Sequence, residues 1–226
     1  MVLKLTNVVK HVLLSSTLAG LFTVSVFAQE INVLDQNGKG LENMVVYLLP
    51  KHSVSAEGVD NNKKAEVHQV DKQFSPYITV VQKGKDVVFV NEDDITHHIY
   101  SALGPKRFSF KLRTEQQQQI INFEQTGHVS MGCNVHDWMS GHLLVVDTPF
   151  YGITDKQGRV NFDHIADDEY QVVVWHPQLN MPNNQMSQTR LLVASQAQVV
   201  LINVVADFDD IPEQRSLDEF EFLEGY

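Results

Sequence analysis

The stretch GCNVHDWM (132–139) holds the only cysteine of this 226-residue chain, followed at three-residue steps by a histidine and a methionine. Cys133, His136 and Met139 bring a thiol, an imidazole and a thioether, three of the donor types used by mononuclear copper sites. On an extended strand the three side chains would be spread over about 20 Å, because each residue advances the chain by about 3.3 Å. We therefore expect a compact loop after a strand.

A second imidazole is available from the segment NEDDITHHIYS (91–101), which contains His97 and His98. Neighbouring residues of a strand point to opposite faces, so regular structure brings one of the two to the site. Strand parity alone does not choose between them. With either histidine, the chain offers the full donor set of one blue copper ion.

Three other interpretations of the cysteine stay open. A structural zinc ion could be bound by Cys133, two histidines and a water or a carboxylate such as Asp137. A nucleophile and base pair of Cys133 and His136 is less favoured, because residues three apart on a tight loop rarely align and no oxyanion-binding device is evident. The cysteine could also be a small buried residue without chemistry.

The first 28 residues have the pattern of a cleaved secretory signal: two lysines, an apolar run over 12–27, and a small residue before the cut. The apolar run is shorter than the roughly 20 residues of a membrane-spanning helix and includes Ser15, Thr17 and Gly20. We therefore expect export to the periplasm with no stable membrane insertion after cleavage. In an oxidising compartment, an unpaired cysteine indicates a reactive thiol, an intermolecular bridge or a metal ligand.

Composition and charge narrow the class of partner. The chain is 43% hydrophobic and 20% charged, as in globular proteins, with a formal net charge of -11. Removal of the signal, which carries two lysines and no acid, makes the chain more acidic. No nucleic-acid or anionic-lipid partner is therefore expected. The acidic segment 206–226 is predicted to be a disordered tail.

Strand signals cover almost all of the chain after residue 30. Short runs rich in β-branched and aromatic residues are separated by Gly, Asn, Asp and Pro, and helical periodicity is hard to find. The runs are 31–35, 44–50, 65–70, two within 74–94 joined at Lys83-Gly84, 97–101, 107–112, 119–127, 128–133, 141–147, 169–177 and two within 189–205. Such short strands predict an all-β protein built as an antiparallel sandwich or barrel.

The central part of the chain resembles the cupredoxins, a family of small blue copper proteins. Asn91 lies six residues before His97, and a strand ends in GCNVHDWM, whose Cys-x-x-His-x-x-Met spacing is similar to the short loop of amicyanin. The resemblance covers about residues 66–147 and implies a cupredoxin Greek-key β-sandwich over 65–147. It selects His97 over His98. The ligands that it implies for one mononuclear copper ion are His97, Cys133, His136 and Met139.

One position departs from the cupredoxin pattern. The family often has Asn directly after the first histidine, where it ties the two ligand loops together, and this chain has His98. We expect the tie to be made differently, and His98 stays the alternative ligand. The segments THHIYS, KRFSFKL, GCNVHDWM and VVDTP also resemble secreted plastocyanin-like proteins associated with methylamine utilisation, a name that implies no substrate here.

The two flanks resemble the two parts of one other domain. INVLDQNGKGLENMVVYLLP (31–50) and GITDKQGRVNFDHIADDEYQVVVWHP (152–177) are similar to a transthyretin-like or carboxypeptidase-regulatory-like sandwich. This implies a discontinuous β-sandwich of residues 30–60 plus 148–205, in which the copper domain is inserted or on which it packs. The alternative is a single cupredoxin with an extra hairpin at each end. Neither flank shows a catalytic set.

These features predict a secreted type 1 copper protein that carries single electrons between redox partner proteins, such as a cytochrome or an oxidoreductase, and is not an enzyme. An acidic surface favours a partner with a basic face. The alternative is a copper carrier or sensor module that uses the same ligands without redox turnover.

Overall fold

The computed structural model describes residues 28–59, 64–205 and 208. The predicted signal peptide and acidic tail therefore lie outside the described residues, apart from Ala28 and Phe208. The described residues form sixteen strands and one short 3-10 helix, Pro182–Asn184, which confirms the all-β prediction. In these described ranges no helix has the length and apolar character needed to cross a membrane.

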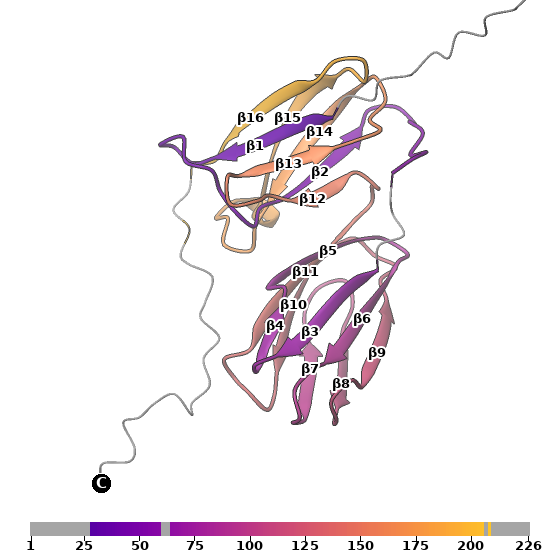
Figure 1. Cartoon of the computed structure of the whole chain (residues 1–226), viewed down its shortest axis with the longest axis vertical. Helices are drawn as coiled ribbons and strands as arrows, with labels where there is room; N and C mark the ends of the chain where they lie inside the picture. Colours follow the sequence, from indigo (N-terminus) through magenta and orange to yellow (C-terminus); the bar gives the residue numbers. More distant parts are fainter. Residues whose placement is uncertain (1–27, 60–63, 206–207, 209–226) are drawn as a thin grey trace, which may run out of the picture.

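The strands at the two ends of the chain pair with one another to form the flank sandwich, the upper body in Figure 1. One sheet has the order β13-β1-β16 and the other the order β12-β2-β14-β15. The strands are β1 (Gln29–Leu34), β2 (Val45–Pro50), β12 (Tyr151–Ile153), β13 (Arg159–Phe162), β14 (Asp168–Trp175), β15 (Gln185–Leu192) and β16 (Gln198–Asn203).

The middle of the chain forms the site sandwich, the lower body in Figure 1. Its sheets have the orders β5-β11-β10-β7-β8 and β4-β3-β6-β9. The strands are β3 (Ala65–Val70), β4 (Gln73–Ser75), β5 (Ile78–Gln82), β6 (Asp86–Asn91), β7 (His97–Ser101), β8 (Phe108–Leu112), β9 (Gln118–Asn122), β10 (Gly127–Cys133) and β11 (Ser140–Val146). The chain crosses repeatedly between the two sheets, which makes this the predicted Greek-key β-sandwich of cupredoxin type.

The core of the site sandwich follows from the alternation of apolar residues along its strands. Val87 and Phe89 of β6 are fully buried between the sheets, in one cluster with Ile99 of β7 and Val129 of β10. Residues two apart on a strand share a face, so such pairs fill the space between two sheets. Burial of each large apolar side chain stabilises the fold by about 1.5–3 kcal/mol.

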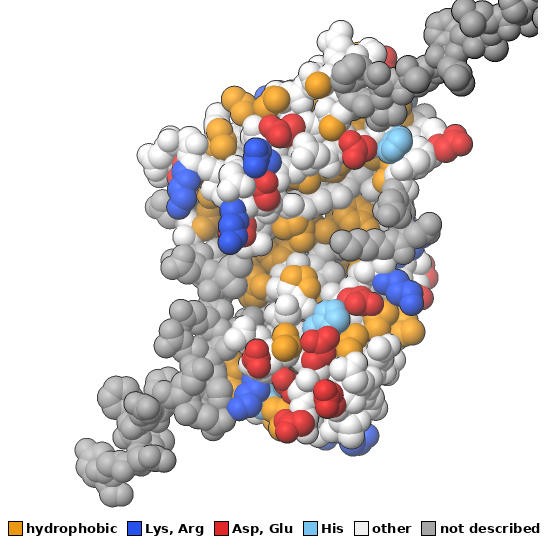
Figure 2. All heavy atoms as spheres, viewed as in Figure 1, with side chains coloured by type: hydrophobic (Ala, Val, Ile, Leu, Met, Phe, Trp, Pro, Cys, Tyr) orange, Lys and Arg blue, Asp and Glu red, His pale blue; other side chains and the backbone are white. Residues whose placement is uncertain are grey.

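Strand β11 contributes to two cores at once. Leu143 and Val145 point into the core of the site sandwich, whereas Leu144 and Val146 belong to a second cluster with Val45 and Trp175 of the flank sandwich. In Figure 2, apolar side chains gather at the waist between the two bodies. The sheet that carries the candidate site therefore also packs against the flank sandwich.

Candidate metal centre

Two neighbouring strands bring the candidate ligands together. β7 begins at His97 and β10 ends at Cys133, and the two strands pair antiparallel, with Cys133 opposite Ile99. In an antiparallel pair the start of one strand lies beside the end of the other. The loop after Cys133 then curls back, since the Met139 N–H donates to the carbonyl of His136 at 3.1 Å. The predicted compact loop is thus present.

The donor atoms of three predicted ligands converge. Cys133 Sγ lies 3.8 Å from His97 Nδ1 and 3.9 Å from His136 Nδ1, and all three donor atoms lie within 4.8 Å of one another. A sulfur and a nitrogen held at about 2.3 Å and about 2.0 Å from one ion, with about 120° between them, are separated by about 3.7 Å. The spacing of these side chains therefore fits a single metal ion between them.

The fourth predicted ligand, Met139, lies in the same buried cluster as Cys133. The whole group is enclosed: His97 is fully buried, and Cys133, His136 and Met139 are 4%, 8% and 2% exposed. The His136 ring packs against Trp138, with 5.2 Å between ring centroids. The structure thus places all four predicted residues in one buried region, and their ligation of copper stays a prediction.

The surroundings of Cys133 favour its thiolate form. Burial raises the pKa of the thiol, but hydrogen bonds from His97 and from backbone groups of Val135, His136 and His98 outweigh this effect and hold the pKa below its ordinary value. A thiolate is the form of cysteine that binds metals. The pKa of His97 is likewise set by opposing effects: burial lowers it, and contacts with Cys133 and Asp93 raise it above its usual value.

His98 lies outside the cluster and ties the two loops together. Its Nε2 lies 2.8 Å from Ser109 Oγ on β8, and its Nδ1 accepts a hydrogen bond from the Asn134 side chain at 3.3 Å. The Asn134 N–H also donates to the carbonyl of His98 at 3.0 Å. These contacts supply the connection that Asn often makes at this position in cupredoxins, so the replacement by His98 preserves the tie.

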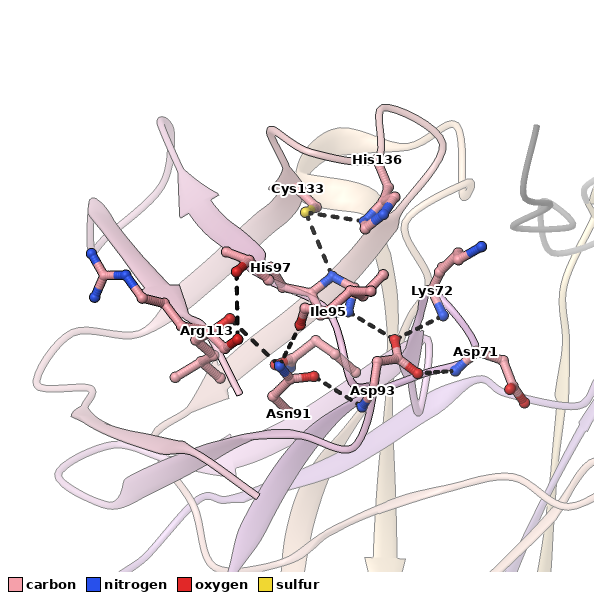
Figure 3. A network of polar contacts seen from close by, with 12 residues as sticks. Asp71, Lys72, Asn91, Asp93, Ile95, His97, Arg113, Cys133 and His136 are labelled. Atoms are coloured by element: carbon pink, nitrogen blue, oxygen red, sulfur yellow. Dashed lines mark hydrogen bonds and ion pairs between the residues drawn. The ribbon is translucent and has the colours of Figure 1, made fainter. Parts of the chain in front are cut away.

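A polar network behind His97 contains a residue that the sequence did not single out (Figure 3). The Asn91 side chain donates to the carbonyl of Ile95 at 2.8 Å and accepts from the Asp93 N–H at 3.0 Å, which shapes the turn before β7. Asp93 in turn contacts His97 directly, with Oδ2 at 2.8 Å from Nε2. Asn91 therefore shapes the turn, and Asp93 contacts a predicted ligand.

The donor set distinguishes between metals. Asp137, the carboxylate considered for a zinc site, is exposed and does not belong to the converging group within the described residues. Two imidazoles, a thiolate and a nearby thioether are instead the donors preferred by a copper ion that cycles between two oxidation states. The residues present therefore fit copper.

No protein-family model and no curated protein matches this chain. Similar solved structures include a copper-containing nitrite reductase from Thermus scotoductus SA-01, at 25% identity and a TM-score of 0.36 over 44% of this chain. This chain spans only 26% of that nitrite reductase.

Two smaller solved structures are covered almost completely. A purple cupredoxin from Nitrosopumilus maritimus is 23% identical with a TM-score of 0.34, over 37% of this chain and 100% of that one. Amicyanin from Paracoccus versutus is 18% identical with a TM-score of 0.34, over 44% of this chain and 98% of that one. These neighbours are cupredoxins at low identity, and the fold and site of this chain are assigned from its own strand order and side chains.

Proposed function

We propose that this protein is a secreted type 1 copper protein that carries single electrons between redox partner proteins and has no enzymatic activity of its own. One observation carries the proposal: a buried thiol lies between two imidazole nitrogens at 3.8 and 3.9 Å, with a buried thioether on the same loop. This donor set suits both Cu(I) and Cu(II), so neither oxidation state has to rebuild its ligand shell.

The side chains that would hold the ion are fixed before it binds. Cys133 and His97 are placed by paired strands, and His136 is placed by the loop that the Met139 N–H closes. Copper bound there would supply a one-electron couple. Met139 would offer its thioether as a weaker fourth donor. Because these groups are buried, water is kept from the ligands, and electrons would enter and leave through the protein without bond making.

Location and partners belong to the same proposal. The signal-like pattern of residues 1–28 supports export to the periplasm. The formal net charge of -11 supports partners with a basic face, whose approach the long-range field would accelerate. A cytochrome or an oxidoreductase of that kind would exchange single electrons with the site.

The visible spectrum of the purified protein after addition of Cu(II) tests the function. We expect an intense blue or purple colour with one copper per chain, because a buried thiolate bound to Cu(II) gives a charge-transfer band. Cys133→Ser removes the sulfur donor and should lose this colour completely. Reduction and reoxidation of the wild type should bleach and restore it.

The spectra of the wild type and of Cys133→Ser together decide between the electron-transfer role and the carrier or sensor role. A wild type that binds copper and stays colourless contradicts a type 1 site and favours the carrier or sensor role. A colour that persists in Cys133→Ser shows that the metal binds elsewhere. Circular dichroism of the metal-free variant controls for loss of the fold.

A further inference from the structure

The carboxylate of Asp93 lies directly behind the buried candidate ligand His97. Asp93 Oδ2 is 2.8 Å from His97 Nε2, while the other ring nitrogen, Nδ1, faces Cys133 Sγ at 3.8 Å. The imidazole thus lies between a carboxylate and the thiol (Figure 3). His97 is fully buried and the Asp93 side chain is 14% exposed, so little water competes for this contact.

The Asp93 carboxylate is itself held by two backbone donors from another part of the sandwich. The Asp71 N–H donates to Oδ1 at 2.8 Å and the Lys72 N–H donates to Oδ2 at 3.0 Å. With these two donors and the His97 ring, the carboxylate has three partners. Its position is therefore fixed from both sides.

The two donors come from a turn with an unusual backbone. Asp71 and Lys72 join β3 to β4, where Val70 pairs with Gln73, and both have positive φ, 52° and 57°. Two successive residues with positive φ make a type I′ turn, which normally uses Asn and Gly. Non-glycine residues in this conformation cost about 1–3 kcal/mol each, and they persist where the surrounding structure imposes it.

This turn also reaches the other ligand loop. Trp138, which packs on His136, donates its indole N–H to the carbonyl of Lys72 at 3.2 Å. The same turn therefore supports His97 through Asp93 and borders His136 through Trp138. Its geometry and the geometry of the candidate site are linked by hydrogen bonds.

The contact decides which nitrogen of His97 can bind a metal. An ionised carboxylate only accepts hydrogen bonds, so Nε2 carries the proton and Nδ1 presents its lone pair to the site. A carboxylate on the far nitrogen of a metal-bound histidine also increases the electron density of the ligand, which favours the more highly charged ion. These two effects act on the same ring.

We infer that Asp93 is a positioning residue that presents Nδ1 of His97 to the metal and lowers the reduction potential of the site by stabilising Cu(II) over Cu(I). The inference rests on the proposed copper function. The turn at Asp71 and Lys72 supports this positioning role, because its backbone N–H groups hold the Asp93 carboxylate in place.

The test compares Asp93→Asn with Asp94→Asn. Asp94 is exposed and has no hydrogen bond or ion pair within the described structure, so its variant removes the same charge one residue away without touching His97. In Asp93→Asn the affinity for Cu(II) relative to Cu(I) should fall 10–100-fold, as is common when a residue supporting a metal ligand is changed. At 59 mV per tenfold change for one electron, the potential rises by about 60–120 mV.

The measurement is a redox titration of the copper-loaded full chain, followed by its visible absorbance. A reduction potential that rises much more in Asp93→Asn than in Asp94→Asn supports the inference. Equal shifts in the two variants overturn it, because a general loss of negative charge then explains the change. Chemical denaturation of both metal-free variants shows whether both are folded under the conditions of the titration.

A second readout does not depend on colour and separates failure of the inference from failure of the proposed function. Nitrogen NMR of the metal-free protein should show a proton on Nε2 of His97, and Asp93→Ala should reduce the fraction of molecules that carry this proton. A colourless wild type with a proton on Nε2 of His97 overturns the copper function and keeps the positioning role. A His97 ring without a proton on Nε2 in the wild type overturns the positioning role.

Discussion

His97 and His98 are neighbours in the sequence and have opposite surroundings in the structure. At the start of β7 the His97 side chain points inward to Cys133, whereas His98 points to Ser109 and Asn134 at the edge of the sheet. Alternation along a strand requires this opposition. The side on which each histidine falls is set by the pairing of β7 with β10 and β8.

Substitution of the two histidines should therefore have different effects. His97→Ala removes a converging donor and should abolish the charge-transfer band of the copper-loaded protein. His98→Ala removes only contacts at the loop edge, so the band should stay and stability should fall by about 1 kcal/mol for the lost hydrogen bonds. Visible spectra and urea denaturation of both variants provide the measurement. Loss of the band in His98→Ala alone would show that the ligand assignment is shifted by one residue.

The candidate site was only partly predictable from sequence. Cys133, His136 and Met139 occur on one loop at regular spacing, so their proximity follows from local chain geometry alone. Asp93 gave no such signal, because it lies between two other acids and its partner at Asp71 is far away in the sequence. Its role becomes visible only when β3, β4 and β6 are placed beside one another.

At the level of elements, most strands were predictable and one turn was not. The segments 65–70 and 97–101 were predicted as strands and coincide with β3 and β7, because each alternates apolar and polar residues between clear breaks. Strand β4 was missed, since Asp71 and Lys72 lack the Asn-Gly signal of a two-residue hairpin turn. The predicted strand at 119–127 is shorter in the structure, where β9 ends at Asn122.

The same turn gives a prediction about stability. Replacing Asp71 and Lys72 together by Asn and Gly keeps both backbone N–H groups that hold Asp93, keeps the net charge, and suits the positive φ values of the turn. Relief of strain exceeds the entropic cost of the new glycine, so we expect a gain of about 0.5–1 kcal/mol. Urea denaturation of the metal-free protein measures it.

The control for this double variant is the copper site itself. Its spectrum and potential should stay as in the wild type, because the carboxylate of Asp93 keeps its backbone donors. A destabilised double variant would mean that the Asp71 or Lys72 side chain contributes more than the backbone strain costs.

At the scale of the whole molecule, the junction between the two sandwiches contains half-buried histidines. His128 Nε2 and His142 Nδ1 lie 2.8 Å apart, and His142 Nε2 lies 3.0 Å from the Tyr77 hydroxyl. The His128 ring packs on Trp175 of the flank sandwich, with 5.1 Å between centroids. Burial lowers the pKa of His142 to about 4, helped by the charges of His128 and His176, and burial alone lowers that of His176 to about 4.

These histidines should make the molecule sensitive to acid. In the unfolded chain a histidine binds its proton near pH 6.5, but His142 and His176 in the folded protein do so only near pH 4. Between these values the unfolded state binds more protons, so the free energy of unfolding falls as the pH decreases from about 6.5 to about 4. Each histidine contributes on the order of 3 kcal/mol to that fall. Chemical denaturation at a series of pH values measures it.

His176→Asn isolates one of these contributions. His176 Nδ1 accepts the Gln178 N–H at 3.3 Å, and an asparagine oxygen can take over that role without titrating. The variant should show a smaller loss of stability over the same pH range, whatever its stability at neutral pH. An unchanged slope would show that His176 is protonated as readily in the folded protein as in the unfolded chain.

The double use of β11 has a consequence for how the molecule melts. One strand supplies Leu143 and Val145 to the core around the candidate site and Leu144 and Val146 to the core shared with the flank sandwich. If either sandwich unfolds, one buried face of β11 becomes exposed, and the other sandwich loses packing that it shares with this strand. Calorimetry should therefore record one cooperative transition in place of two. A metal ion bound beside Met139 should also raise the melting temperature of the flank sandwich, although the ion does not contact its strands.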